Sequence, residues 1–262
     1  MTTEQCTATV RQTGRFLAEY SALLMGSGAT CIRIEKNVTR IARAYGKQVE
    51  ISIMPRHLQL TISEAGSGGD CLTLNTSVAA VPICTGTITR LSELSWNIAD
   101  HGLTLDEATA RLNGIAADRD SRSECGVALT VALANASFCR LFGGDWVAMA
   151  VVAAATFAGF MLRQSLLRHG MDVRAVFLVC AFVSTVIASG DRLFGLGSTS
   201  DIAIATGVLY LVPGIPLLNS FSDMLYRHYL CALGRFADAA VLICCLSAGL
   251  CLGMFAMNTG MF

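Results

Sequence analysis

The sequence predicts an α+β N-terminal domain over residues 1–124, followed by an all-α polytopic membrane domain over residues 125–262. Three observations predict this architecture. The first half holds 12 of the 19 lysines and arginines and 13 of the 19 acidic residues. Apolar and polar residues alternate in parts of that half, as they do in half-buried strands. The second half consists mainly of apolar runs, and about 20 apolar residues suffice for a helix to cross a bilayer.

Two helices are expected at the start of the first half, over residues 8–27 and 30–46, because apolar side chains recur there at helical spacing. The second helix is amphipathic, and the glycine at its end is a typical stop signal. Its basic face consists of Arg33, Lys36, Arg40, Arg43 and Lys47. This face is either a solvated surface or a contact for anionic lipid headgroups or an anionic substrate.

Three strands are expected next, over residues 48–53, 58–62 and 72–74, where apolar and polar side chains alternate. Pro55 predicts a turn between the first two strands, and the glycine-rich residues 66–70 predict a turn between the last two. The glycine run does not fit a phosphate loop, because it lacks the Lys-Ser/Thr ending and opens no helix.

Two further helices should complete the first half. Apolar residues at positions 88, 91, 94 and 98 predict the first of them. A capping box that pairs Thr104 with Glu107 predicts the start of the other, which should end near Ala116. A short charged linker over residues 118–124 then leads into the second half.

Five membrane-spanning helices are expected in the second half. Their predicted bounds are residues 125–142, 146–162, 173–190, 201–220 and 236–257. The second and fourth connections between them carry Arg163, Arg168, Arg174, Arg227 and Arg235, whereas the other connections carry only two arginines. Because cytoplasmic loops are enriched in positive charge, this count places the N-terminus in the cytoplasm. The start of the chain shows no signal peptide, so we expect the first half to stay in the compartment where it is made and the spans to lie in the inner membrane.

The fourth predicted span is interrupted by Pro213-Gly214-Ile215-Pro216, which cannot continue a regular helix. Broken helices expose free N–H groups and a positive dipole end, which transporters use to attract anions. The alternative is a proline kink with ordinary polar contacts between helices. The candidates for substrate contact or proton coupling around this break are Pro213, Gly214, Pro216, Asn219, Ser220 and Asp223.

Two polar residues of the first predicted span are further candidates. Asn135 lies within the apolar run and Arg140 lies near its end. Charged residues inside spans are functional hypotheses by default. Arg140 could bind a carboxylate substrate, or it could pair with Asp145 across the Gly143-Gly144 turn.

Several functional classes are disfavoured by the residues. The net charge is zero, so no nucleic-acid partner is expected. The four histidines share no metal-ligand spacing, and neither GxSxG, HExxH nor a Walker A pattern occurs, so we expect no metal, no cofactor and no enzymatic activity. The eleven cysteines form no CxxC pair and are interpreted as small buried apolar residues.

Three segments give the chain a resemblance to a known family. They are Gly28-Ala29-Thr30-Cys31-Ile32-Arg33-Ile34-Glu35, Phe142-Gly143-Gly144-Asp145 and Leu211-Val212-Pro213-Gly214-Ile215-Pro216-Leu217-Leu218-Asn219. In these segments the chain resembles the threonine/serine exporter family, and within it the larger subunit of the two-component form. The resemblance extends over nearly the whole chain.

The resemblance implies a secondary-active exporter that works in a hetero-oligomer. Fused members of the family carry a second membrane half that is lacking here, so a separate small membrane subunit, similar to the YjjB-like subunit, is implied as partner. The two-component form implies succinate or a similar dicarboxylate as substrate, and the fused form implies threonine or serine. A membrane-anchored sensor or scaffold is the alternative of a different class.

Overall fold

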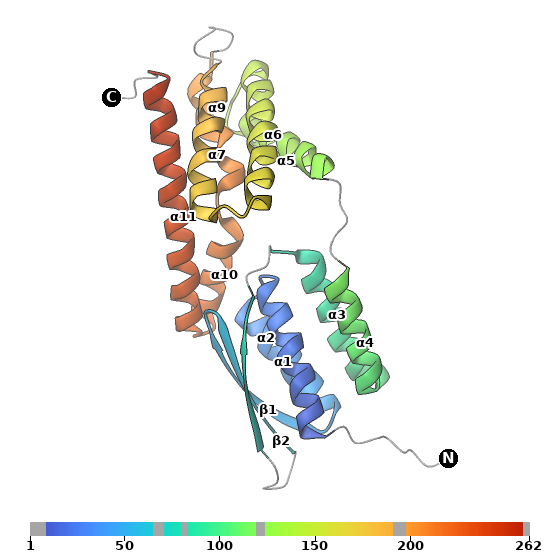
Figure 1. Ribbon diagram of the computed structural model, residues 1–262. Coiled ribbons are helices and arrows are strands. Elements are labelled where there is room, and N and C mark those ends of the chain that lie inside the picture. Colours follow the sequence, from blue (N-terminus) through green and yellow to red (C-terminus); the bar gives the residue numbers. More distant parts are fainter. Residues whose placement is uncertain (1–8, 65–70, 80–82, 119–123, 191–197, 259–262) are drawn as a thin grey trace. The chain divides into compact units, whose positions relative to one another are not determined.

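The computed structural model describes residues 9–64, 71–79, 83–118, 124–190 and 198–258 (Figure 1). The chain forms two compact units. The first unit comprises Met1–Ser121 and Ile215–Phe236, and the second comprises Arg122–Gly214 and Ala237–Phe262. The predicted glycine turn at residues 66–70 and most of the predicted linker lie outside the described residues.

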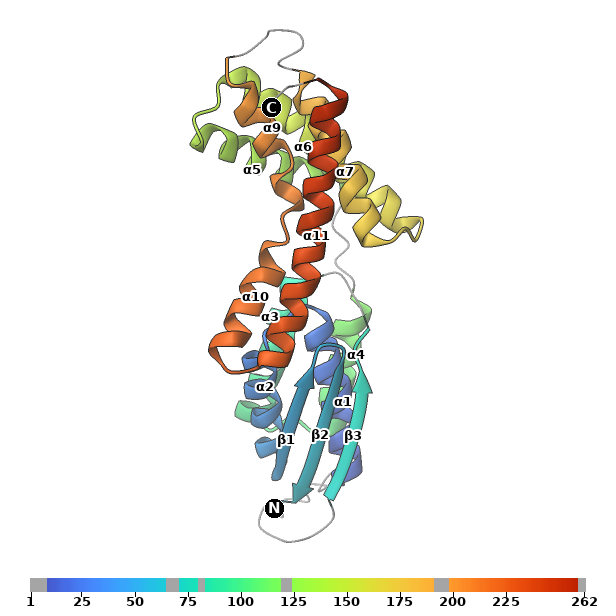
Figure 2. The same ribbon diagram turned by 90° about the vertical axis from the view of Figure 1, so that its left-hand side faces the viewer.

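The first unit is built on a three-stranded antiparallel sheet in the order β1-β2-β3. Helices α1 and α2 pack against the sheet, α3 packs against α2, and α4 packs against α3 (Figures 1 and 2). The elements are α1 (Val10–Gly26), α2 (Cys31–Ala44), β1 (Lys47–Met54), β2 (His57–Glu64), β3 (Cys71–Ser77), α3 (Thr85–His101) and α4 (Leu105–Ala117).

The core of this unit follows from the sequence periodicity. On the central strand, Leu58, Leu60 and Ile62 are buried at every second position, as expected for one covered face of a sheet. Helix α2 buries apolar side chains spaced three and four residues apart, including Ile34 and Val38, against the same core. Local sequence and packing therefore agree in this unit.

Two additional helical segments belong to the first unit. Helix α10 (Gly214–Leu225) and the first turns of α11 (Tyr229–Ala256) are joined by a tight turn. Arg227 adopts the left-handed conformation with φ 66°, and the N–H of His228 donates to the carbonyl of Asp223 at 2.8 Å. This geometry ends α10 in the way a C-terminal glycine usually would.

The second unit is helical throughout its described part. It contains α5 (Glu124–Leu141), α6 (Trp146–Arg168), α7 (Val173–Ala188), α9 (Ser200–Gly207), the 3₁₀ turn η1 (Leu209–Leu211) and the rest of α11. Helix α6 packs between α5 and α7, and α9 contacts all three. Gly143 turns the chain between α5 and α6 with φ 93°, and Asp145 caps α6 by accepting from the N–H of Ala148 at 2.7 Å.

Helices α7 and α11 approach closely at a pair of glycines one helical turn apart. A Cβ atom on Gly249 would lie 2.2 Å from the carbonyl oxygen of Leu178, and one on Gly253 would lie 2.7 Å from the Cβ of Thr185. Small residues four apart are a common way for apolar helices to bring their backbones together. The Gly249-x-x-x-Gly253 pair therefore fixes this contact.

The predicted membrane domain of five spans is wrong. Among the described residues, only α6 and α11 are both long and apolar enough to cross a membrane, or three spans if the broken α9–η1–α10 segment counts as one. Helix α7 has 16 residues, which rise about 24 Å and fall short of the hydrocarbon core of about 30 Å. Helix α5 carries Glu124 at its start and Arg140 in its last turn.

The predicted separation of an N-terminal domain from the membrane domain is also wrong. Residues 215–236, which were assigned to the fourth span and the connection after it, belong to the same compact unit as the N-terminal α+β elements. The physical reason is that their polar side chains find partners there. Apolar composition alone therefore misassigned this segment to a membrane span.

The close glycine contact gives a stability prediction. We expect Gly249→Leu to destabilise the second unit by about 1–3 kcal/mol, because its added atoms would overlap the Leu178 backbone. Ala248→Leu, at the exposed neighbouring position, is the matched control and should change little. Thermal unfolding of the purified chain in detergent measures both. Equal melting temperatures for the two variants would contradict the packing role.

Candidate functional site

Two distant segments meet inside the first unit and form the candidate site. One is the turn between α1 and α2, residues 28–31, and the other is the α10–α11 hairpin. The Asn219 amide donates to the carbonyl of Gly28 at 2.7 Å, and the N–H of Cys31 donates to Oδ1 of Asp223 at 2.8 Å. Arg235 donates from Nη2 to the carbonyl of Ala29 at 2.7 Å. The hairpin is thus hydrogen-bonded to consecutive peptide groups of the turn.

A buried ion pair lies at the centre of this contact. The Asp223 side chain is fully buried, and its Oδ2 lies 3.0 Å from Nη1 of Arg235, whose side chain is 17% exposed. Each charged group also has a backbone partner in the turn, Cys31 for the carboxylate and Ala29 for the guanidinium. A buried charge is tolerated when it is both paired and hydrogen-bonded, and this pair satisfies both conditions.

The helix break positions these side chains. The chain is non-helical at Val212 and Pro213, and α10 begins at Gly214. Pro216 therefore lies in the first turn of α10, where its missing N–H removes no intrahelical bond. From that start, Asn219 and Asp223 are one turn apart and both face residues 28–31, while Ser220 donates to the carbonyl of Ala232 on α11 at 2.7 Å.

Two thiols lie near the ion pair, and a histidine of the same hairpin contacts α2. Cys31 and Cys231 are both buried. The pKa of the Cys31 thiol is raised, mainly by the neighbouring Cys231 thiol and secondly by burial. The Cys231 thiol also lies 3.6 Å from the carbonyl of Ile53 on β1. His228 pairs with Glu35 of α2 at 3.5 Å. The surroundings keep Cys31 a neutral thiol and tie α11 to both α2 and β1.

The other two predicted candidates lie in the second unit and have separate roles there. Asn135 is buried on α5, and its amide donates to the Thr156 hydroxyl at 2.6 Å and to the Thr206 carbonyl at 2.9 Å. It thereby connects α5, α6 and α9. Such a fully engaged amide is the polar contact between helices expected in an apolar bundle.

Arg140 is engaged at the turn after α5. It donates to the carbonyl of Gly144 at 3.1 Å, and its guanidinium lies 5.4 Å from the centre of the Trp146 ring. Asp145 instead accepts from the N–H groups of Ala148 and Ser198, and these hydrogen bonds lower the pKa of its carboxyl. The predicted alternative of an Arg140–Asp145 pair is therefore not formed in the described part of the chain.

The structure brings Asn219, Ser220 and Asp223 together near the broken helix, whereas Asn135 and Arg140 belong to the second unit. Sequence reasoning missed Arg235, which it counted as a loop charge. An arginine inside an apolar helical run was the available signal, because such a charge needs a buried partner.

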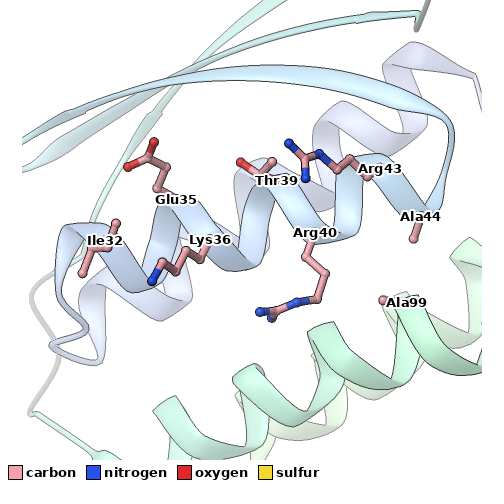
Figure 3. A pocket seen from close by; sticks show the side chains of 8 residues that line it. All are labelled: Ile32, Glu35, Lys36, Thr39, Arg40, Arg43, Ala44 and Ala99. Atoms are coloured by element: carbon pink, nitrogen blue, oxygen red, sulfur yellow. The ribbon is translucent and has the colours of Figure 1, made fainter.

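A second feature of the first unit is a hollow of about 680 Å³ on the basic face of α2 (Figure 3). Arg40 extends from α2 toward α3, donates to Asn37 at 2.9 Å and Ser95 at 2.7 Å, and stacks on Trp96 at 3.7 Å. Lys36 and Arg43 are exposed at the same hollow. One arginine is thus fixed by packing, and an anion contact at this face stays a prediction.

Comparison with known proteins identifies the family. The sequence profile described as "Putative threonine/serine exporter" matches residues 15–257, which include most of both units. The chain belongs to this family. Its function class is therefore transport, and the long apolar helices α6 and α11 fit a membrane protein.

Three relatives illustrate the similarity. The "Probable succinate transporter subunit YjjP" of Klebsiella aerogenes is 30% identical over 246 residues, 93% of each chain. The protein of the same name from Escherichia coli K12 is 31% identical over 247 residues, 92% of each chain. A "Probable threonine/serine exporter" of Mycobacterium tuberculosis is 27% identical over 156 residues, 60% of this chain and 27% of that protein. No solved structure matches the chain significantly.

The buried ion pair gives a second prediction. Asp223→Ala and Arg235→Ala should each destabilise the protein by about 3–5 kcal/mol, because each leaves an uncompensated buried charge. The double variant should lose clearly less than the sum of the two single losses. Denaturant unfolding in detergent measures this cycle, with the exposed Asp238→Ala on α11 as control. Additive losses would show that the two side chains act independently.

Proposed function

We propose that the chain is the larger subunit of a two-component exporter of small carboxylates, with succinate as the main substrate. The observation that carries this proposal is the match to two proteins named as subunits of a succinate transporter, over more than nine-tenths of each chain. The printed names of these two relatives describe them as subunits, which supports a transporter with more than one chain. We further propose a small, YjjB-like integral membrane subunit as the partner.

Threonine or serine is the second candidate substrate. The family description and the relative from Mycobacterium tuberculosis both name threonine/serine export. That relative is much longer, since the alignment covers only 27% of it. Amino acids and dicarboxylates share a carboxylate group, so the same family could recognise both through common chemistry.

We propose that export is driven by an ion or proton gradient across the bacterial inner membrane, with the N-terminus in the cytoplasm. Fewer arginines lie in the connections between helices than the sequence indicated. Arg163 and Arg235 lie inside helices α6 and α11. Arg227 lies in the short turn between α10 and α11, which belongs to the same unit as the N-terminal elements, and a positive charge in a short loop supports a cytoplasmic N-terminus.

The Asp223–Arg235 pair is the proposed coupling element. It connects the hairpin after the helix break to the turn at residues 28–31 through a small number of strong polar contacts. A carboxylate paired with a guanidinium can change partner when it is protonated or when a competing anion binds. Pro213, Gly214, Pro216, Asn219 and Ser220 form the helix start that positions this carboxylate and are proposed to contribute to it.

Reconstituted vesicles test the proposed function. Proteoliposomes loaded with labelled succinate should lose it only when both this chain and the small subunit are inserted. Parallel vesicles loaded with threonine distinguish the two substrates. Asp223→Asn should reduce succinate efflux at least tenfold, whereas Asp238→Asn should not, because Asp238 is exposed and lies outside the ion pair.

The outcomes separate the proposals. Efflux of threonine but not succinate would replace the main substrate by the second candidate. Efflux of succinate by this chain alone would remove the partner from the proposal. Absence of efflux for both compounds, with both chains inserted, would contradict the exporter function as proposed.

A further inference from the structure

A half-buried arginine in the second unit has no acidic partner among the described residues. Arg163 lies on α6, which is one of the two helices long and apolar enough to span a membrane. Its Nε atom is buried and makes no hydrogen bond. Within the described part of the chain, no ion pair or hydrogen bond engages its guanidinium. An ionisable residue within a potential membrane span is a functional-site hypothesis by default, and no described residue neutralises this one.

The surroundings of Arg163 are apolar on most sides. Its guanidinium lies 5.6 Å from the centre of the Phe177 ring on α7. The apolar cluster at this place includes Val176, Cys180 and Leu211, with Leu162 and Leu166 of α6 packed against it. In such a medium an electrostatic contact is stronger than in water, so a bound anion would be held effectively.

Two hydroxyl groups complete a small polar cluster at the same place. The hydroxyls of Ser184 on α7 and Tyr210 on η1 lie 3.0 Å apart, and Tyr210 is close enough to Arg163 to interact electrostatically. The Ser184 hydroxyl can donate either to the carbonyl of Ala155, 3.5 Å away, or to Tyr210. When it donates to Tyr210, the Tyr210 hydroxyl hydrogen is free to donate elsewhere. A guanidinium and a phenol together supply the donors that a carboxylate accepts.

A glycine makes room for the two hydroxyls. Gly159 precedes Arg163 by one helical turn, so both residues face the same side of α6. A Cβ atom at position 159 would lie 2.1 Å from the Tyr210 hydroxyl oxygen and 2.3 Å from that of Ser184. The absence of a side chain at Gly159 thus allows the two hydroxyls to approach α6 one turn before Arg163.

We infer that Arg163, with Tyr210 beside it, binds a carboxylate group of the exported substrate. This inference rests on the proposed export of small carboxylates and names the residues that recognise the acid group. Succinate and threonine both carry such a group, so the assignment holds for either substrate. Arg163 was counted as a loop charge in the sequence, and its position within α6 changes that interpretation.

Efflux kinetics with variants of the full chain test the inference. In proteoliposomes with both subunits, Arg163→Gln should raise the KM for succinate about 10- to 100-fold, the range expected for a lost charged hydrogen bond. Arg163→Lys should give a smaller increase, because lysine keeps the charge but cannot form a bidentate contact. Arg168→Gln is the matched control: it lies on the same helix, is exposed and pairs with Glu124.

A competition measurement separates recognition from a structural role. Succinate should inhibit wild-type efflux of labelled succinate, whereas its uncharged diamide should not. Arg163→Gln should lose this preference for the acid over the diamide, while Tyr210→Phe should weaken it. A purely structural arginine would lower the amount of active protein without changing the preference.

The outcomes identify which proposal fails. Wild-type efflux together with an unchanged KM and an unchanged preference in Arg163→Gln would overturn the assignment and leave the exporter function standing. Loss of inserted protein for both Arg163 variants would also overturn it, because the arginine would then be structural. No wild-type efflux of succinate or threonine would contradict the exporter function on which the assignment rests.

Discussion

The ion pair between Asp223 and Arg235 is the interaction on which the first unit's arrangement depends. Its two members come from α10 and from the start of α11, and both also bind the backbone of the turn at residues 28–31. Removing either charge would leave the other buried without a partner, so the hairpin and the turn associate as one element. An element that is held or released as a whole is what a two-state coupling mechanism requires.

Local rules predicted the secondary structure of the first unit well because its signals are short-range. The alternation at Leu58, Leu60 and Ile62 gave the central strand, and the Thr104–Glu107 capping box gave the start of α4. Each of these signals depends on residues that are near in sequence. The prediction of five membrane-spanning helices was wrong because its signal was composition alone. An apolar run has the same composition whether it faces lipid or is buried in protein, and residues 201–220 contain three short helical pieces rather than one span.

The sequence predicted some residues of the candidate site but not their partners. The spacing of Asn219 and Asp223 placed them on one helix face, and the structure agrees. Their partners could not be deduced, because the two hydrogen bonds join residues that are separated by 191 and 192 positions in the chain. A different signal was available: two of the three segments that carry the family resemblance, residues 28–35 and 211–219, contain Gly28 and Asn219, which are hydrogen-bonded here, although Asp223 and Arg235 lie outside them. Segments that define a family can thus mark a contact even where periodicity cannot.

Two arginines inside apolar helices differ in their bonding partners, and this difference distinguishes a structural role from a role in recognition. Arg235 has a carboxylate at 3.0 Å and a backbone carbonyl at 2.7 Å, so its charge is neutralised within the chain. Arg163 has a buried, unbonded Nε, and its neighbours are an aromatic ring, a thiol and a phenol. The desolvation cost is similar in kind for both, but only one is offset by a residue of the described chain. For Arg163 no described residue supplies the compensating charge, and the carboxylate of the proposed substrate has the required sign.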